Sequence, residues 1–116
     1  MADTLLVMAG CGGILIALVH AWLGHTLVLR PISALTPTLR SVNAAVFQLS
    51  TLYWIGAGLA LLSTPWLWGP EGRLIVVIGA VFIYASAAVA NAWATSGRHF
   101  GWIGLGLVSL MALAGL

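Results

Sequence analysis

Residues 4–29, TLLVMAGCGGILIALVHAWLGHTLVL, decide the fold of this chain, because they contain no Asp, Glu, Lys or Arg. A helix of about 20 apolar residues crosses the roughly 30 Å of hydrocarbon in a bilayer. Three further long apolar stretches follow, at 38–64, 71–95 and 99–116, with charged residues only near the starts of the first two of these. We therefore expect an all-α polytopic membrane protein, with four antiparallel transmembrane helices in one compact bundle and a single domain over 1–116.

The composition agrees with this class, because 62% of the residues are apolar and only 5% are charged, whereas soluble domains have about 25% charged residues. Prolines mark the ends of the apolar stretches. Pro31 cannot continue the first helix, and Pro65 falls in the turn after the second. Thr36 followed by Pro37 is typical of an N-cap and a first helical residue. All connections are short, which favours antiparallel neighbouring helices.

The arginines predict the orientation in the membrane. Three of the four lie in or beside the first and third loops, on one side: Arg30, Arg40 and Arg98. The other side carries Arg73 together with the two acidic residues. By the positive-inside rule we expect a multi-pass protein of the inner membrane with both termini outside the cytoplasm. The three clustered arginines are expected to contact anionic lipid headgroups.

Polar residues within the spans gather toward the arginine-bearing end, at depths of roughly 7 to 15 Å by helical rise, with one histidine nearer the surface. They are His20, His25, Gln48, Asn91 and His99. One interpretation is a set of hydrogen bonds that join the helices. The other is a cavity for a ligand, a cofactor or a partner helix, since ionisable groups inside a membrane are often functional.

A metal or haem site has weak support from the spacing. His20 and His25 lie five residues apart, about 140° around a helix, so one ion would not bind both. His99 and His25 could pair only near the membrane surface, and Cys11, the only cysteine, is expected to be inert packing. We expect no metal. No histidine and carboxylate are placed to activate a hydroxyl, so we also expect no catalytic residues and no enzyme.

A transporter is a further alternative, because the small multidrug transporters are also four-helix chains of about this length. Their mechanism needs a carboxylate within the first helix to exchange protons for a cationic drug. Asp3 and Glu71 lie at helix ends in this chain. A transporter of that kind would require His20 to replace the acid.

Small residues predict where helices approach one another closely. Alanines and Ser86 are dense in 85–94, so we expect the third helix to be central. Gly56 with Ala60, and Gly97 with Gly101, have the spacing of close helix contacts. Trp22, Trp54 and Trp93 lie away from the extreme ends of the spans, where they fill space or contact a flat apolar molecule.

Several of these residues resemble the pattern of a family of small bacterial four-helix membrane proteins, and the likeness spans most of the chain: His20, Gly24, Arg30, Pro31, Gly97, Arg98, His99 and Trp102. That family carries His-Ser-x-x-Gly-Glu in its first helix and a Trp-His pair in its second. Here His25 stands where the glutamate falls, and Phe47-Gln48 replaces the pair. The resemblance implies the fold and directs attention to His20, Arg30 and His99, but it implies no activity.

We interpret the chain as a non-catalytic accessory or stabilising subunit of a larger membrane complex, one of energy conversion being a candidate. The alternative is a membrane protein that binds a ligand, haem or metal in the polar layer. Expected partners are membrane lipids and either other membrane subunits or further copies of the chain, with a pigment, quinone or haem as candidate ligands and no nucleic acid. The sequence does not identify a cofactor.

Overall fold

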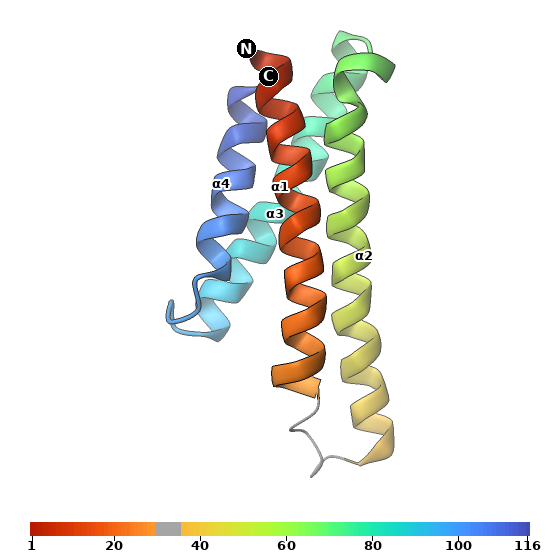
Figure 1. Cartoon of the computed structure of the whole chain (residues 1–116), viewed down its shortest axis with the longest axis vertical. Coiled ribbons are helices and arrows are strands. Elements are labelled where there is room, and N and C mark those ends of the chain that lie inside the picture. The colour runs from red at the N-terminus through yellow and green to blue at the C-terminus, as the bar shows by residue number, and fades with distance from the viewer. Residues whose placement is uncertain (30–35) are drawn as a thin grey trace.

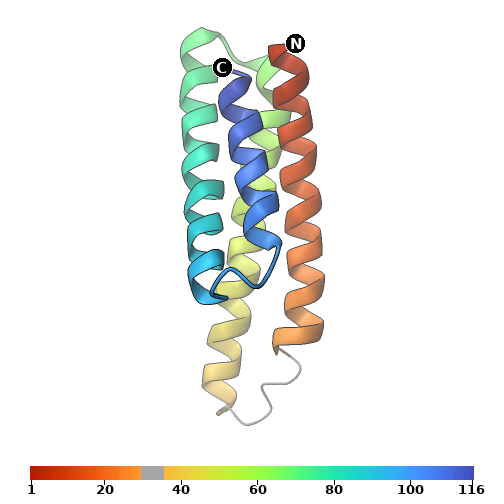
Figure 2. The same cartoon turned by 90° about the vertical axis from the view of Figure 1, so that its left-hand side faces the viewer.

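The computed structural model describes residues 1–29 and 36–116, which fold into four helices packed against one another (Figure 1). The helices are α1 (Ala2–Leu23), α2 (Pro37–Leu67), α3 (Pro70–Ala94) and α4 (Gly101–Ala114). A π-helical segment, η1 (Gly24–Leu29), continues α1. The helices run alternately up and down, and both termini lie at the same end (Figure 2). The described residues contain no strand.

Three of these helices are long and apolar enough to cross a membrane, and α4 is a shorter apolar helix of 14 residues. The predicted N-cap at Thr36 is confirmed, because its Oγ1 accepts a hydrogen bond from the Leu39 N–H at 3.4 Å. The turn predicted at Pro65 is wrong, since α2 continues to Leu67. A proline so near the end of a helix removes one main-chain hydrogen bond without stopping the last turn.

The turn between α3 and α4 makes α4 start later than the predicted residue 99. Ser96 and Gly97 have φ angles of 51° and 73°, in the left-handed region that ends helices. The Gly97 N–H donates to the Ala92 carbonyl at 2.8 Å, and the Trp102 indole N–H donates to the Gly97 carbonyl at 3.2 Å. Gly97 therefore belongs to a turn, and the predicted helical pair of Gly97 and Gly101 is wrong.

The closest helix contact joins α1 and α2 through two glycines. A Cβ added to Gly10 would lie 2.7 Å from the Gly58 carbonyl oxygen, and one added to Gly58 would lie 2.9 Å from the Gly10 oxygen. The two main chains therefore nearly touch, which only residues without a Cβ allow. Gly56, predicted to make such a contact together with Ala60, has open space where its Cβ would be.

The core lies along the bundle axis and includes Leu6, Leu61, Val77 and Leu105, all at most 1% exposed. Tyr84 is also fully buried, and its hydroxyl donates to the Trp54 carbonyl at 2.6 Å. A Cβ at Gly13 would overlap the Tyr84 hydroxyl, so the missing side chain makes room for the ring.

The prediction that α3 is central is wrong. Within an apolar 18-residue stretch of each helix, only 17% of the residues of α3 are buried, compared with 28% in α1 with η1 and 28% in α2. It packs through Val77, Ala80 and Tyr84, whereas Ala90 and Ala94 are exposed. Small residues permit close contact on any face of a helix, but they do not determine which face is used.

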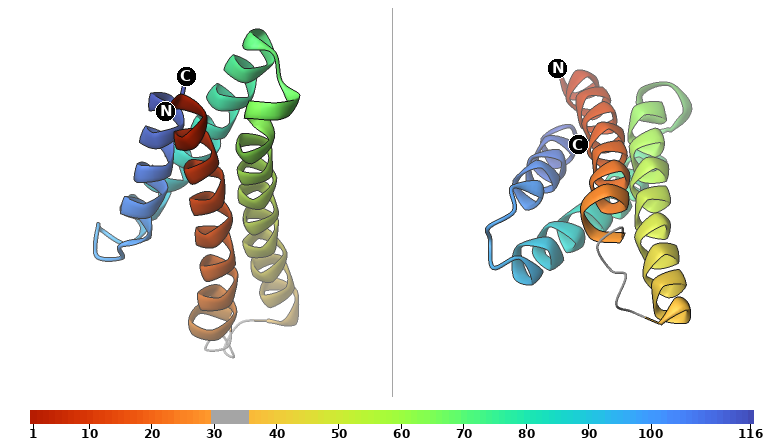
Figure 3. Two further views of the ribbon diagram at one scale, coloured as in Figure 1. Left: turned by 45° about the horizontal axis from the view of Figure 1, so that its top comes forward. Right: turned by 60° about the horizontal axis from the view of Figure 1, so that its bottom comes forward.

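At the end of the bundle where both termini lie, Arg73 of α3 connects α1 with the residues after α4. Its guanidinium donates to Asp3 Oδ1 in α1 and to the Gly115 carbonyl after α4, each at 2.7 Å. At the other end, α1 with η1 and α2 reach beyond the turn between α3 and α4 (Figures 1 and 3). We call this the basic end, because Arg40 and Arg98 lie exposed there.

Candidate ligand-binding cavity

A cavity of about 580 Å³ lies toward the basic end, below the start of α4. Its walls come from residues 15–28 of α1 and η1, from Phe47 and Trp54 of α2, and from the end of α3, the following turn and the first residues of α4. The lining is mostly apolar. Its polar side chains are His20, Asn91, Thr95 and His99. This composition is typical of small-molecule sites, which combine an apolar wall with a few polar groups.

The helices leave this space because of their unequal lengths. α1 with η1 has 28 residues, Ala2–Leu29, and α2 has 31, whereas α4 has only 14. Gly104 lies close to α1, since a Cβ there would be 3.1 Å from Ile16 Cδ1. α1 and α4 are therefore in close contact at Gly104, and the space between the helices widens from there toward the basic end.

His20 lies at the centre of the aromatic wall. Its ring stacks on Phe47, with centroids 4.0 Å apart and planes 4° from parallel. The ring of Trp54 lies 4.4 Å away, tilted by 46°. His20 Nε2 also lies 3.3 Å from Ser50 Oγ. Contacts from three residues of α2, spaced like one face of a helix, thus fix the orientation of the imidazole.

Gly24 makes the stacking of His20 and Phe47 geometrically feasible. A Cβ at Gly24 would overlap the ring of Phe47, so the ring occupies the space that a side chain would need. Gly24 is also where η1 begins, and Thr26 Oγ1 donates back to the Trp22 carbonyl at 2.8 Å. π-Helical turns often occur at functional sites, and this one forms part of the cavity wall.

Asn91 and His99 form the polar part of the opposite wall. Asn91 Oδ1 is buried and has no hydrogen-bond partner among the residues described. His99 Nδ1 accepts the Gly101 N–H at 3.1 Å, and its ring stacks on Phe100 with centroids 4.9 Å apart. A buried oxygen without a partner is unusual in folded proteins.

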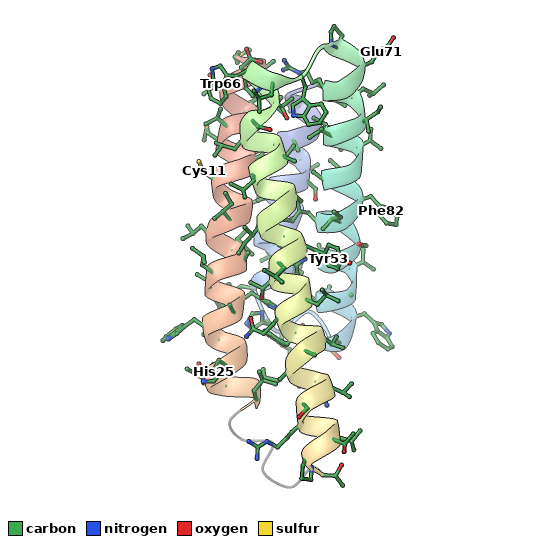
Figure 4. All side chains as sticks on the ribbon, turned by 90° about the vertical axis from the view of Figure 1, so that its right-hand side faces the viewer. Cys11, His25, Tyr53, Trp66, Glu71 and Phe82 are labelled. Atoms are coloured by element: carbon green, nitrogen blue, oxygen red, sulfur yellow. The ribbon has the colours of Figure 1, made fainter. Side chains whose placement is uncertain are left out.

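Three of the five predicted binding residues line the cavity: His20, Asn91 and His99. His25 and Gln48 are exposed and do not line it. Figure 4 shows His25 on the outer side of the lower end of α1. Gln48 follows Phe47 by one residue, about 100° around the helix, so the two cannot share a face. The sequence predicted how far along its helix each side chain lies, but not the direction in which it points around the helix axis.

Two of the three arginines predicted to contact lipid headgroups lie within the described residues. Arg40 and Arg98 are exposed at the basic end. Arg30 lies outside the described residues. The headgroup contacts themselves stay a prediction.

Sequence reasoning did not assign Phe47 and Ser50 to the site. Their signal is a helical spacing, because residues 47, 50 and 54 lie on one face of α2. Trp54, considered for contact with a flat molecule, lines the cavity, whereas Trp22 and Trp93 are 66% and 84% exposed.

The residues that the structure describes contain no group of three or more His, Cys, Asp or Glu that could hold a metal ion. Glu71 lies at the end opposite the cavity (Figure 4), and Asp3 pairs there with Arg73. The polar side chains of the cavity wall are therefore two imidazoles, the Asn91 amide and the Thr95 hydroxyl, without a carboxylate.

Comparison with known proteins finds no matching family model, no matching curated protein and no matching solved structure. The likeness to small bacterial four-helix membrane proteins thus stays a prediction.

Proposed function

We propose that this chain is an integral membrane protein that binds a small, largely apolar molecule in the cavity between α1, α2 and α4. The observation that carries the proposal is the apolar cavity of about 580 Å³ with His20, Asn91 and His99 in its wall. This volume is within the range of about 300 to 1,000 Å³ found for small-molecule sites. Polar groups at one part of an apolar wall favour a ligand with one polar group on an apolar body.

The outer surface of the bundle supports a membrane location. Large apolar side chains are exposed along all three long helices, including Leu15 at 61%, Leu52 at 64% and Ile75 at 73%. So much exposed apolar surface is unusual for a monomer in water, whereas the acyl chains of a membrane would cover it. In this setting the cavity lies in the half of the bundle that carries Arg40 and Arg98, so we place it in the leaflet on that side.

Retention of lipid-soluble molecules through purification tests the proposal. The chain is purified in mild detergent, and the bound molecules are extracted and identified by mass spectrometry. Asn91→Leu removes the unpartnered amide and fills part of the cavity, so it should reduce the retained molecule several-fold. Gln48→Leu is the matched control, because it makes the same kind of change at an exposed residue outside the cavity.

A second pair of variants separates binding from folding. His20→Ala removes the ring stacked on Phe47 and should also reduce retention, whereas His25→Ala at an exposed position should not. Circular dichroism reports whether each variant keeps its helices. If the cavity variants fold normally and retain as much of every extracted molecule as their controls, the proposed function is wrong.

An accessory subunit is the second candidate function, and the outer face of α3 favours it. A shallow groove there is lined by small residues, Ala85 and Ala90, between Phe82 and Trp93. Figure 4 shows Phe82 projecting from the outer side of α3. Small residues flanked by large ones suit contact with another transmembrane helix. Ala90→Leu should then release a stoichiometric partner or dissociate an oligomer in native mass spectrometry, and an unchanged monomer before and after substitution would contradict this role.

A further inference from the structure

The hydrogen bonds around His20 determine which of its ring nitrogens is left for a ligand. The Ser50 hydroxyl lies 2.7 Å from the Phe47 carbonyl and donates its single hydrogen there. Ser50 Oγ can therefore only accept from His20 Nε2, 3.3 Å away. An uncharged imidazole carries one N–H, so Nδ1 is the acceptor. Within the described part of the chain, no donor lies within hydrogen-bond distance of Nδ1.

Asn91 lies in the wall of the same cavity. Its Oδ1 is buried without a partner in the part of the chain that the structure covers. Because this oxygen has almost no accessible surface, a ligand in the cavity does not reach it, and Asn91 is not counted as an acceptor for the ligand.

His99 has the opposite polarity. Because its Nδ1 accepts the Gly101 N–H at 3.1 Å, the proton of the uncharged ring lies on Nε2. The cavity wall thus combines His20, whose Nδ1 is an acceptor, with His99, whose Nε2 is a donor. A hydroxyl group matches this set, since it donates one hydrogen bond and accepts others.

Building on the proposed function, we infer that the ligand is a neutral phenol, a hydroxyl group on an aromatic ring with an apolar tail. The hydroxyl donates to His20 Nδ1. The ring is favoured by the aromatic wall of His20 and Trp54, whose rings lie 4.4 Å apart. An acceptor at His20 Nδ1 disfavours an anionic headgroup, and a ketone or ether would leave it without a donor.

A matched pair of probes tests the inference: 4-nonylphenol and 4-nonylanisole, which differ only in that the anisole carries a methyl group on the phenolic oxygen. Equilibrium dialysis between micelles with and without the purified chain, quantified by mass spectrometry, corrects for partition into detergent. We expect the phenol to bind about 3- to 10-fold more tightly, which is the worth of one neutral hydrogen bond.

Three variants locate the preference. His20→Phe keeps an aromatic ring beside Phe47 and Trp54 but removes the Nδ1 acceptor, so the ratio of the two affinities should fall toward one. Ser50→Ala removes the group that fixes the proton on Nε2, and the ratio should fall as well. Ser86→Ala is the matched control, because its hydroxyl makes the same local bond, to the Ile83 carbonyl at 3.0 Å, away from the cavity.

The outcomes distinguish this inference from the proposed function. Equal binding of both probes, or tighter binding of the anisole, would overturn the inference and leave a binding cavity in place. Binding of neither probe above the protein-free micelles would overturn both. A phenol preference that survives in His20→Phe would also overturn it, because the hydroxyl would then lie elsewhere.

Discussion

Gly58→Ala is expected to destabilise the bundle, and Gly56→Ala is its matched control in the same helix. A Cβ at Gly58 would lie 2.7 Å from Ile14 Cγ1, 2.9 Å from the Gly10 oxygen and 3.2 Å from the Ile14 nitrogen. Two of these atoms belong to the main chain and cannot rotate away, so α1 and α2 must separate by about 0.5 to 1 Å to reach ordinary contact distances. A Cβ at Gly56 meets nothing within 4 Å.

The magnitude follows from the difference between the two variants. Overpacking a close contact costs about 1 to 3 kcal/mol. Replacing a helical glycine by alanine also contributes about 0.5 to 1 kcal/mol of stability, but this gain is the same at both positions and cancels. We therefore expect Gly58→Ala to be less stable than Gly56→Ala by about 1 to 3 kcal/mol.

The free energy of unfolding can be measured by titrating SDS into detergent micelles and following tryptophan fluorescence, since Trp54 is 7% exposed in the folded bundle. Gly10→Ala, which alters the same contact from α1, should give a similar loss. Equal or greater stability of Gly58→Ala relative to Gly56→Ala would show that the two main chains are not in contact.

Three other substitutions have defined outcomes. Tyr84→Phe removes a buried hydrogen bond of 2.6 Å to a main-chain carbonyl, and the same titration should show a loss of about 0.5 to 1.5 kcal/mol. Asp3→Asn breaks the ion pair with Arg73 and leaves the bond from Arg73 to the Gly115 carbonyl in place. Because the Asp3 side chain is 61% exposed, the loss should stay below about 1 kcal/mol and shrink at high salt, and a larger loss would mean that the pair is shielded from water. Gly24→Ala would displace the Phe47 ring, and it should weaken binding in the cavity more than it lowers helix content by circular dichroism.

The helices could be predicted because hydropathy and proline act locally. Four apolar runs give four helices, and the N-cap at Thr36 follows from its own side chain. The late start of α4 depends on the left-handed conformations of Ser96 and Gly97. Serine and glycine also occur inside helices, so these residue types alone do not show that a helix ends there. The contact of Gly10 with Gly58 leaves no apolar pattern, because neither residue has a side chain.

The candidate site could be predicted only in part. Distance from the arginines placed His20 and Asn91 at one depth, and both line the cavity. His25 and Gln48 lie at similar depths but are exposed, since each residue turns about 100° around its helix and depth carries no information on that angle. The role of Phe47 required the knowledge that α1 and α2 touch closely enough for its ring to fill the space beside Gly24.

In the proposed membrane location, the shortness of α4 has a consequence for the surrounding lipid. Its 14 residues rise about 21 Å, well below the roughly 30 Å of a hydrocarbon layer, whereas α2 with 31 residues exceeds that thickness. The bilayer is thus expected to thin beside α4 and to stay thick beside α2, a hydrophobic mismatch that differs from one flank to the other. Acyl-chain length should accordingly change the tilt of the bundle and the width of any lateral entrance under α4.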